Sequence, residues 1–337
     1  MHFHSLKFDI RSNSIDAAAS VSRLYRANDL SCELAGNTAA LTVELERAAS
    51  RHALPIEPIA AGRAVFGETN LLGGMCWFAD GRFYSTSNGE FTSEAEFLPA
   101  EGIIRVNVGG RYDSLSADAV VALVVKQIMQ SFVLPFYRLK FLHGAVVARD
   151  DITVMLTGSG GAGKSTTALR MFVDGYTLLS DDGPLFTRHE EKTLALSSLD
   201  FCQVTTKTLE LMPILNEGVI GEPDHRGKYR VHTDRIRSES AWRRPRRITH
   251  VVQLDRRKCS QPVLTKTAMH DLVALTMADA QIVFRSPVFR EWSMFREHSR
   301  FAFDVITGLG DDASAWRLTF ADDHLDDIPS LLAGLER

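Results

Sequence analysis

The stretch "LTGSGGAGKSTTALRMFVDGYTLLSDD", residues 156–182, decides the fold of this chain. Residues 158–165 fit the pattern G-x-x-x-x-G-K-[ST], which is typical of a loop that binds the phosphates of a nucleotide. An apolar run predicts a strand over residues 152–157, and the pattern after the loop predicts a helix over residues 165–173 that ends at Gly175. "YTLLSDD" predicts a further strand. This order is the context in which the motif forms a nucleotide site, and it predicts an α/β fold.

Each residue type in the loop has a physical role. The glycines adopt backbone angles closed to other residues, so that successive N–H groups can point at phosphate oxygens, with the positive end of the helix dipole behind them. Lys164 supplies a charge for the β- and γ-phosphates, and the Ser165 hydroxyl is placed to bind Mg²⁺. We therefore expect ATP and Mg²⁺ as cofactors, with the choice of ATP over GTP left open. The predicted nucleotide-binding residues are Gly158, Ser159, Gly160, Gly161, Ala162, Gly163, Lys164, Ser165 and Thr166.

Two carboxylates, Asp181 and Asp182, follow the predicted strand "YTLLS". They lie beside the phosphate loop if this strand neighbours the first one, because open α/β sheets bind ligands at the carboxyl ends of their strands. Adjacent strand residues point to opposite faces, so only one of the two faces the phosphates fully unless the chain turns there. One carboxylate could accept a proton from an acceptor hydroxyl and the other could hold Mg²⁺ or its water. Alternatively, the two aspartates have no chemical role and belong to a solvated turn or cap a helix.

His143 is the third candidate. It precedes a predicted strand over residues 144–148, which a tight turn at residues 149–151 joins to the strand that enters the phosphate loop. A histidine in this position could act in catalysis. A lone histidine is more often a hydrogen-bonded residue of the core, and composition does not separate the two.

Together these features resemble the catalytic domain of the HPr kinase/phosphorylase family. That family shows a histidine before a strand, a G-x-x-x-x-G-K-S loop, and an aspartate pair after the next helix and strand. The order "LHG … GSGGAGKST … GY…LLSDD" resembles most the HPr-kinase-like proteins of modified-peptide gene clusters, including kinases that phosphorylate a serine of lasso-peptide precursors. The resemblance covers roughly residues 141–187.

The resemblance implies a role for each matching residue. Asp181 is expected to act as general base on a serine hydroxyl, Lys164 to neutralise the γ-phosphate, and His143 to lie near the base or the phosphate. Ser165 and Asp182 are expected to bind the metal ion.

The chain also departs from the family. Bifunctional members carry a glutamate-isoleucine-arginine-glycine segment, tied to metal binding and to the reverse reaction. Here the corresponding "LSSLDFCQVTTKTLELM", residues 196–212, offers only Asp200 and Glu210. We therefore expect a kinase without phosphorylase activity.

The 337-residue length and the pattern outside the motif favour two domains, because a domain takes about 150 residues. We predict an HPr-kinase-like catalytic domain over residues 139–337 and a smaller α+β domain over residues 1–138. In the latter, Asp80-Gly81 and Asn88-Gly89 predict hairpins. Residues 116–136 predict a buried helix.

A basic segment follows the motif region. Nine of the 22 residues in 226–247 are Lys or Arg, which could bind an acidic peptide, nucleotide phosphates or nucleic acid, or form a solvated loop with ion pairs to nearby acids. Pro245 and the polar run predict an irregular loop. Lys228 and Arg256 are candidates for a further cation that contacts phosphate or substrate. A core strand is predicted over residues 248–254. Asp322-Asp323 and Asp326-Asp327 are interpreted as a helix surface without a chemical role.

Composition excludes several classes of protein. The net charge of −4 gives no global argument for nucleic acid, so we expect no nucleic-acid partner. The four cysteines, Cys32, Cys76, Cys202 and Cys259, lack the C-x-x-C spacing of a structural zinc site. The N-terminus lacks the pattern of a secretory signal and no apolar run is long enough to span a membrane, so we expect a cytoplasmic protein.

Three functions remain open. The first is a kinase that phosphorylates a serine-type hydroxyl of a peptide or protein, and the second uses the same mechanism on a small metabolite. The third is a non-catalytic nucleotide sensor. Classical P-loop switches carry a metal-binding aspartate much further from the lysine, so the close aspartate pair favours transfer. The resemblance also implies a homo-oligomer.

Overall fold

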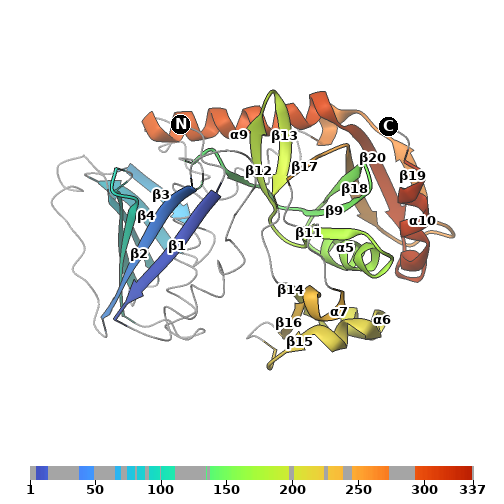
Figure 1. Ribbon diagram of the computed structural model, residues 1–337, viewed down its shortest axis with the longest axis horizontal. Coiled ribbons are helices and arrows are strands. Elements are labelled where there is room, and N and C mark those ends of the chain that lie inside the picture. The colour runs from blue at the N-terminus through green and yellow to red at the C-terminus, as the bar shows by residue number, and fades with distance from the viewer. Residues whose placement is uncertain are drawn as a thin grey trace. The chain divides into compact units, whose positions relative to one another are not determined.

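The computed structural model describes residues 5–13, 38–48, 65–69, 74–79, 82–87, 91–98, 100–110, 134, 137–196, 201–223, 227–237, 245–272 and 293–335 (Figure 1). The chain divides into two compact units. The first comprises Met1–Ser31, Ala35–Arg138 and Gln281–Ala302, and the second comprises Cys32–Leu34, Leu139–Ala280 and Phe303–Arg337. The functional domains expected over residues 1–138 and 139–337 stay a prediction.

The first unit contains a seven-stranded sheet in the order β1-β2-β7-β6-β5-β4-β3. Its strands are β1 (Ser5–Ser12), β2 (Thr38–Ala48), β3 (Val65–Thr69), β4 (Gly74–Ala79), β5 (Arg82–Ser87), β6 (Phe91–Leu98) and β7 (Ile103–Gly110). β1, β2 and β7 run parallel, and β7 to β3 are antiparallel neighbours. Alternate residues of the central strands are buried, as a sheet with one covered face requires: Val43, Leu45, Ile104, Val106 and Val108.

The two hairpin predictions are confirmed by the pairing of β4 with β5 and of β5 with β6. The predicted helix over residues 116–136 lies outside the described residues, except for Leu134.

The second unit is built on a six-stranded sheet in the order β11-β9-β10-β18-β20-β19. Its strands are β9 (Ala145–Arg149), β10 (Ile152–Thr157), β11 (Thr177–Ser180), β18 (His250–Arg256), β19 (Val263–Lys266) and β20 (Ser314–Phe320). β10, β18 and β20 are parallel, and β9 is antiparallel to both β10 and β11. The carboxyl ends of β10, β11, β18 and β20 therefore meet at one edge of the sheet, where α/β proteins bind ligands.

The local predictions around the motif are confirmed. β9 and β10 form the predicted hairpin, in which Asp150 takes a left-handed conformation (φ 52°). Helix α5 (Lys164–Val173) follows the loop, and Gly175, with φ 101°, allows the chain to turn back into β11. The helix buries Ala168, Leu169, Met171 and Phe172 in a core that it shares with Val147 and Val154 of the sheet. The expected α/β fold class is confirmed.

Smaller elements surround this sheet. A four-stranded sheet has the order β17-β13-β12-β8, and a three-stranded sheet has the order β14-β16-β15. Short helices accompany the three-stranded sheet (Figure 1). The bounds are β8 (Lys140–Phe141), β12 (Leu185–His189), β13 (Lys192–Leu196), β14 (Phe201–Thr205), α6 (Thr206–Leu211), η2 (Pro213–Gly218), β15 (Val219–Ile220), β16 (Lys228–His232), α7 (Thr233–Ile236) and β17 (Arg246–Arg247).

Parts of the basic segment 226–247 therefore form regular elements, β16, α7 and β17, where the sequence predicted an irregular loop. β16 forms because it pairs with β14, about 25 residues earlier in the chain. A local sequence pattern does not show such a distant pairing.

The C-terminal part adds α9 (Ser293–Asp312), then η5 (Asp322–Asp327) and α10 (Ile328–Ala333) after β20. The predicted strand over 248–254 is confirmed as β18, which begins two residues later, at His250. In the part of the chain that the structure describes, no helix is both long and apolar enough to cross a membrane.

Candidate functional site

The phosphate loop joins β10 to α5 and uses glycine where other residues are strained. Gly158, Gly161 and Gly163 have φ values of 144°, 82° and 91°, in the region that L side chains rarely adopt. A Cβ on Gly158 would also lie 2.9 Å from the backbone oxygen of Leu254 in β18. The loop therefore packs directly on the neighbouring parallel strand, and its shape depends on that glycine.

Lys164, the first residue of α5, folds back over the loop. Its Nζ donates hydrogen bonds to the backbone oxygens of Gly158 (2.8 Å) and Ser159 (3.1 Å), and the side chain is buried. A loop rich in N–H donors with a positive charge held over it is suited to bind an anion.

Asp181 lies directly after β11, next to the start of α5. The Ser165 hydroxyl donates to the backbone oxygen of Asp181 at 3.2 Å. The hydroxyl predicted to bind Mg²⁺ and the predicted base are thus neighbours across the edge of the sheet. β11 is not the direct neighbour of β10 that the sequence analysis considered, because β9 lies between them. β10 and β11 nevertheless run in the same direction, so their carboxyl ends lie at the same edge of the sheet.

The Asp181 carboxyl group is buried, with 2% of the residue exposed. Its Oδ2 accepts a hydrogen bond from the backbone N–H of Gln203 at 3.2 Å. Burial raises the pKa of Asp181 to about 7, and the charge of Asp182 adds to this, while the Gln203 hydrogen bond and the Lys228 charge oppose it. A carboxylate with this pKa is suited to accept a proton near neutral pH.

Asp182 is exposed, whereas Asp181 is buried. This agrees with the alternation expected at the end of a strand. After it, Gly183 turns the chain with φ 80°, and its N–H donates to the Gly144 oxygen at 3.0 Å. Leu142 N likewise donates to Pro184 O at 3.3 Å.

These two hydrogen bonds place the segment that carries His143 beside the turn that follows the aspartate pair. His143 itself is exposed. The alternative of a histidine in the hydrophobic core is therefore wrong.

The two candidate cations lie at different places on this edge. Lys228 is in β16, paired with Thr205 of β14, and its charge acts on the Asp181 carboxylate. Arg256 ends β18 and lies beside the last glycine of the loop, with its Cδ 3.7 Å from the position of a Cβ on Gly163.

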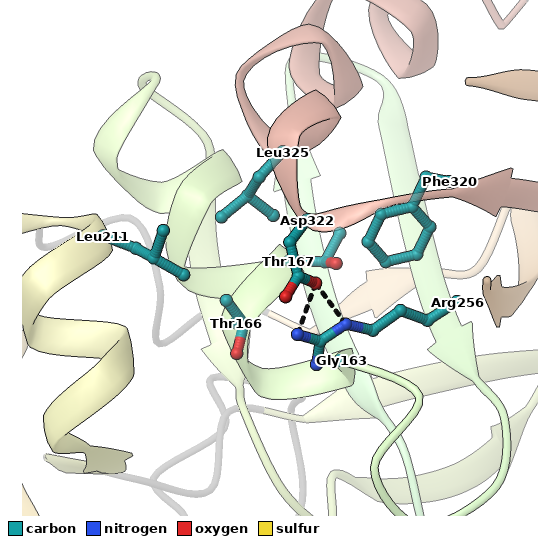
Figure 2. A pocket seen from close by; sticks show the side chains of 8 residues that line it. All are labelled: Gly163, Thr166, Thr167, Leu211, Arg256, Phe320, Asp322 and Leu325. Atoms are coloured by element: carbon teal, nitrogen blue, oxygen red, sulfur yellow. Dashed lines mark hydrogen bonds and ion pairs between the residues drawn. The ribbon is translucent and has the colours of Figure 1, made fainter. Parts of the chain in front are cut away.

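Arg256 also lines a small pocket at the first turn of α5 (Figure 2). Elements far apart in the sequence supply its walls, which are Gly163, Thr166, Thr167, Leu211, Arg256, Phe320, Asp322 and Leu325. The hydroxyl of Thr166, a predicted nucleotide-binding residue, lies 3.5 Å from that of Thr208 in α6.

Sequence reasoning missed two partners in the site. Gln203 contributes only its backbone, which leaves no signal in the sequence. Asp322 was expected on a helix surface and lies in η5, and its carboxylate accepts hydrogen bonds from Lys207 and Arg256 that the sequence did not indicate. Of the acidic substitutes considered, Glu210 is exposed on α6, and Asp200 lies outside the described residues.

The residues present fit a magnesium ion. Ser165, Asp181 and Asp182 supply hydroxyl and carboxylate oxygens, the donors that Mg²⁺ prefers, and Mg²⁺ is commonly bound by one or two carboxylates together with phosphate oxygens. Within the described ranges, no three His, Cys, Asp or Glu side chains form a metal-binding group.

Known proteins that resemble this chain carry the description HPr kinase/phosphorylase. The chain is 37% identical over 62 residues to the HPr kinase/phosphorylase of Bacillus mycoides, which is 18% of this chain and 20% of that protein. It is 40% identical over 57 residues to that of Listeria monocytogenes serotype 4a, or 17% and 18% of the two chains. About 60 residues of this chain are similar in sequence to HPr kinase/phosphorylases. The predicted resemblance to that family is confirmed.

The matched segment spans about a fifth of the length of these relatives. The HPr kinase/phosphorylase of Halalkalibacterium halodurans matches a segment of similar length, with 40% identity over 62 residues. This is 18% of this chain and 20% of that protein. The solved structure of the Hpr(Ser) kinase/phosphatase from Coxiella burnetii superposes with a TM-score of 0.32 and 11% identity over 58% of this chain and 93% of that one. No family model matches the chain.

Proposed function

We propose that this HPr-kinase-like protein is a Mg-ATP-dependent kinase that transfers the γ-phosphoryl group to a serine-type hydroxyl of a peptide or protein. The observation that carries the proposal is the buried Asp181 carboxyl group, with its pKa raised to about 7, beside Ser165 at the start of the phosphate-loop helix. A switch that only binds nucleotide has no need for such a base. The catalytic domain would extend over residues 139–337.

In the proposed reaction, Asp181 accepts the proton of the acceptor hydroxyl as its oxygen attacks the γ-phosphorus. The bond from the γ-phosphorus to the bridging oxygen of ATP breaks, and ADP leaves with the electron pair. Lys164 and the N–H groups of the loop stabilise the negative charge on the phosphates. A magnesium ion held by Ser165 and Asp182 would neutralise further phosphate charge.

The remaining candidates have supporting roles. The exposed His143, on the segment beside the turn after Asp182, would contact the acceptor or the transferred phosphate. Arg256 would contact the nucleotide from the far side of the loop. Lys228 would keep Asp181 acidic enough to lose its proton near neutral pH, because its positive charge opposes the effect of burial.

A peptide acceptor is favoured by the position of the basic segment. β16, which carries Lys228 and Arg230, pairs with β14, whose Gln203 N–H binds the Asp181 carboxylate. A basic strand so close to the base suits a polypeptide with acidic residues near its serine, of the lasso-peptide-precursor type. We expect no phosphorylase activity, since residues 196–212 lack the family's glutamate-isoleucine-arginine-glycine segment. A homo-oligomer is part of the proposal.

Two alternatives use the same site. In the first, the acceptor is a small metabolite, and Asp181 keeps its role. In the second, the protein is a nucleotide sensor that transfers nothing. The raised pKa of Asp181 favours the two kinases over the sensor.

The test follows the label of γ-labelled ATP into serine peptides and into a metabolite pool, with the wild type, Asp181→Asn and Asp326→Asn. The last variant loses the same charge on an exposed side chain away from the loop, and should behave as the wild type. Label on a peptide, absent with Asp181→Asn, supports the peptide kinase. Label on a small molecule moves the function to the first alternative, and bound nucleotide without transfer in any mixture moves it to the sensor.

A further inference from the structure

Asp322 joins two cations from different elements at the carboxyl-end edge of the six-stranded sheet. Lys207 Nζ of α6 donates to its Oδ2 at 2.7 Å, and the Arg256 guanidinium at the end of β18 donates to its Oδ1 through both Nε and Nη2. Hydrogen bonds from Lys207 and Arg256 lower the pKa of Asp322 against the opposing effect of burial. The carboxylate is therefore charged at neutral pH.

The same cations border the phosphate loop. Arg256 lies beside Gly163, and Lys207 precedes Thr208, whose hydroxyl contacts that of Thr166. Figure 2 shows Asp322 and Arg256 pointing toward one another beside the first turn of α5. An internal anion thus holds cations next to the loop that is built to bind an anion.

A third side chain in this pocket has a polar atom without a protein partner. Thr167 is fully buried and lines the pocket, and among the described residues its Oγ1 makes no hydrogen bond. Burying a hydroxyl group unpaired costs free energy, which a ligand oxygen within reach would recover. The pocket is therefore lined by a guanidinium group, a carboxylate and a hydroxyl group without a hydrogen bond among the described residues.

We propose that Asp322 is an internal competitor for the anionic ligand of the phosphate loop. In the free protein it holds Arg256 and Lys207, and the polyphosphate of a nucleotide displaces it from Arg256. This proposal rests on the nucleotide binding proposed above. The exchange is feasible because both side chains of the Arg256–Asp322 pair are partly exposed, 31% and 41%, and such ion pairs are weak.

The competitor role predicts the direction in which ligand affinity changes when Asp322 is replaced. Binding of the polyphosphate must break the contact between Asp322 and Arg256, and a carboxylate that remains nearby repels the ligand. Removing the carboxylate should therefore strengthen binding. If Asp322 instead orients Arg256 toward the phosphates, its removal should weaken binding, so the two roles are separated by the direction of the change.

The experiment measures the dissociation constants of ATP and of inorganic tripolyphosphate by calorimetry at low salt. Asp322→Asn should bind both about three- to tenfold more tightly than the wild type, as expected for loss of one partly exposed competing ion pair. Asp326→Asn is the matched control. It removes the same charge from the same η5 segment, where Asp326 pairs with Arg170 at 3.3 Å, and its affinity should match that of the wild type.

A double variant tests whether the gain in affinity depends on Arg256. In Arg256→Gln the gain from Asp322→Asn should largely disappear, because the competitor no longer has its guanidinium partner. Weaker or unchanged binding by Asp322→Asn, or an equal gain in Asp326→Asn, overturns the competitor proposal and leaves nucleotide binding intact. Absence of ATP binding by all of these proteins, the wild type included, overturns the proposed function as well.

Discussion

The hydroxyl group of Ser165 donates a hydrogen bond of 3.2 Å to the backbone oxygen of Asp181. This contact joins the first turn of the phosphate-loop helix to the end of β11. The Asp181 backbone is therefore held beside the start of the helix that follows the loop. Several consequences of this arrangement can be measured.

Replacing the base should remove transfer without removing the nucleotide. Asp181→Asn keeps a side-chain oxygen that can accept the Gln203 hydrogen bond, but it cannot take a proton. We expect kcat to fall by about 10²- to 10⁴-fold, the usual contribution of a general base. ATP affinity, measured by calorimetry, should be retained. A variant that transfers label at the wild-type rate would show that Asp181 is not the base.

Activity should depend on pH through the same group. Burial raises the pKa of Asp181 to about 7, so the free protein holds a proton there below that pH. We expect kcat/KM for ATP to rise with pH up to about 7 and then to level off, since this parameter reports ionisations of the free enzyme. A profile that is flat between pH 5 and pH 8 would contradict this assignment.

The free energy of unfolding should fall as the pH rises, whereas the activity should rise. The folded pKa of Asp181 lies above the ordinary value of 3.8, so the folded protein binds this proton more tightly than the unfolded chain. The contribution of this group to stability is complete below pH 3.8 and is lost as the pH rises through about 7. The stability gain of Asp181→Asn over the wild type should thus be larger at pH 8 than at pH 5, by about 2–3 kcal/mol. Urea unfolding at both pH values measures it, and an equal difference at the two would contradict the raised pKa.

The sequence predicted the centre of the site because its signals are local. The hairpin of β9 and β10, the loop, α5 and β11 follow one another, and each is marked by apolar periodicity or by glycine. A parallel direction of β10 and β11 then brings Ser165 and Asp181 together. This is the part of the chain that the motif marks.

The rest depends on contacts between distant parts of the chain. Asp322 meets Arg256 because β18 and β20 are parallel neighbours with their carboxyl ends aligned, a pairing that no local pattern marks. Asp322 thus looked like an ordinary helix-surface residue. In the same way, the ladder between β14 and β16 brings Lys228 to the side of Asp181.

Glycine is required at one loop position and dispensable at another. Gly158 combines φ 144° with a Cβ position only 2.9 Å from the Leu254 oxygen, whereas a Cβ on Gly160 would meet no atom within 4 Å. Gly158→Ala should therefore lower the free energy of unfolding by about 1–3 kcal/mol, the usual cost of backbone strain. Gly160→Ala should lower it by less than about 1 kcal/mol. Urea unfolding of both variants compares them directly, and equal losses would contradict the strain argument.

The charge of Lys228 should set the pH at which the base works. Lys228 favours the ionised form of Asp181, so its removal should raise the pKa of that carboxyl group further. In Lys228→Met we expect the rising limb of the pH profile to move to higher pH by about half a unit to one unit. Arg230→Met is the control, because it removes the same charge from the same strand, where Arg230 lies over the Phe201 ring. If both variants move the profile equally, the basic strand acts on Asp181 as a whole. If neither does, Lys228 does not tune the base, and any loss of activity in Lys228→Met reflects contact with the acceptor.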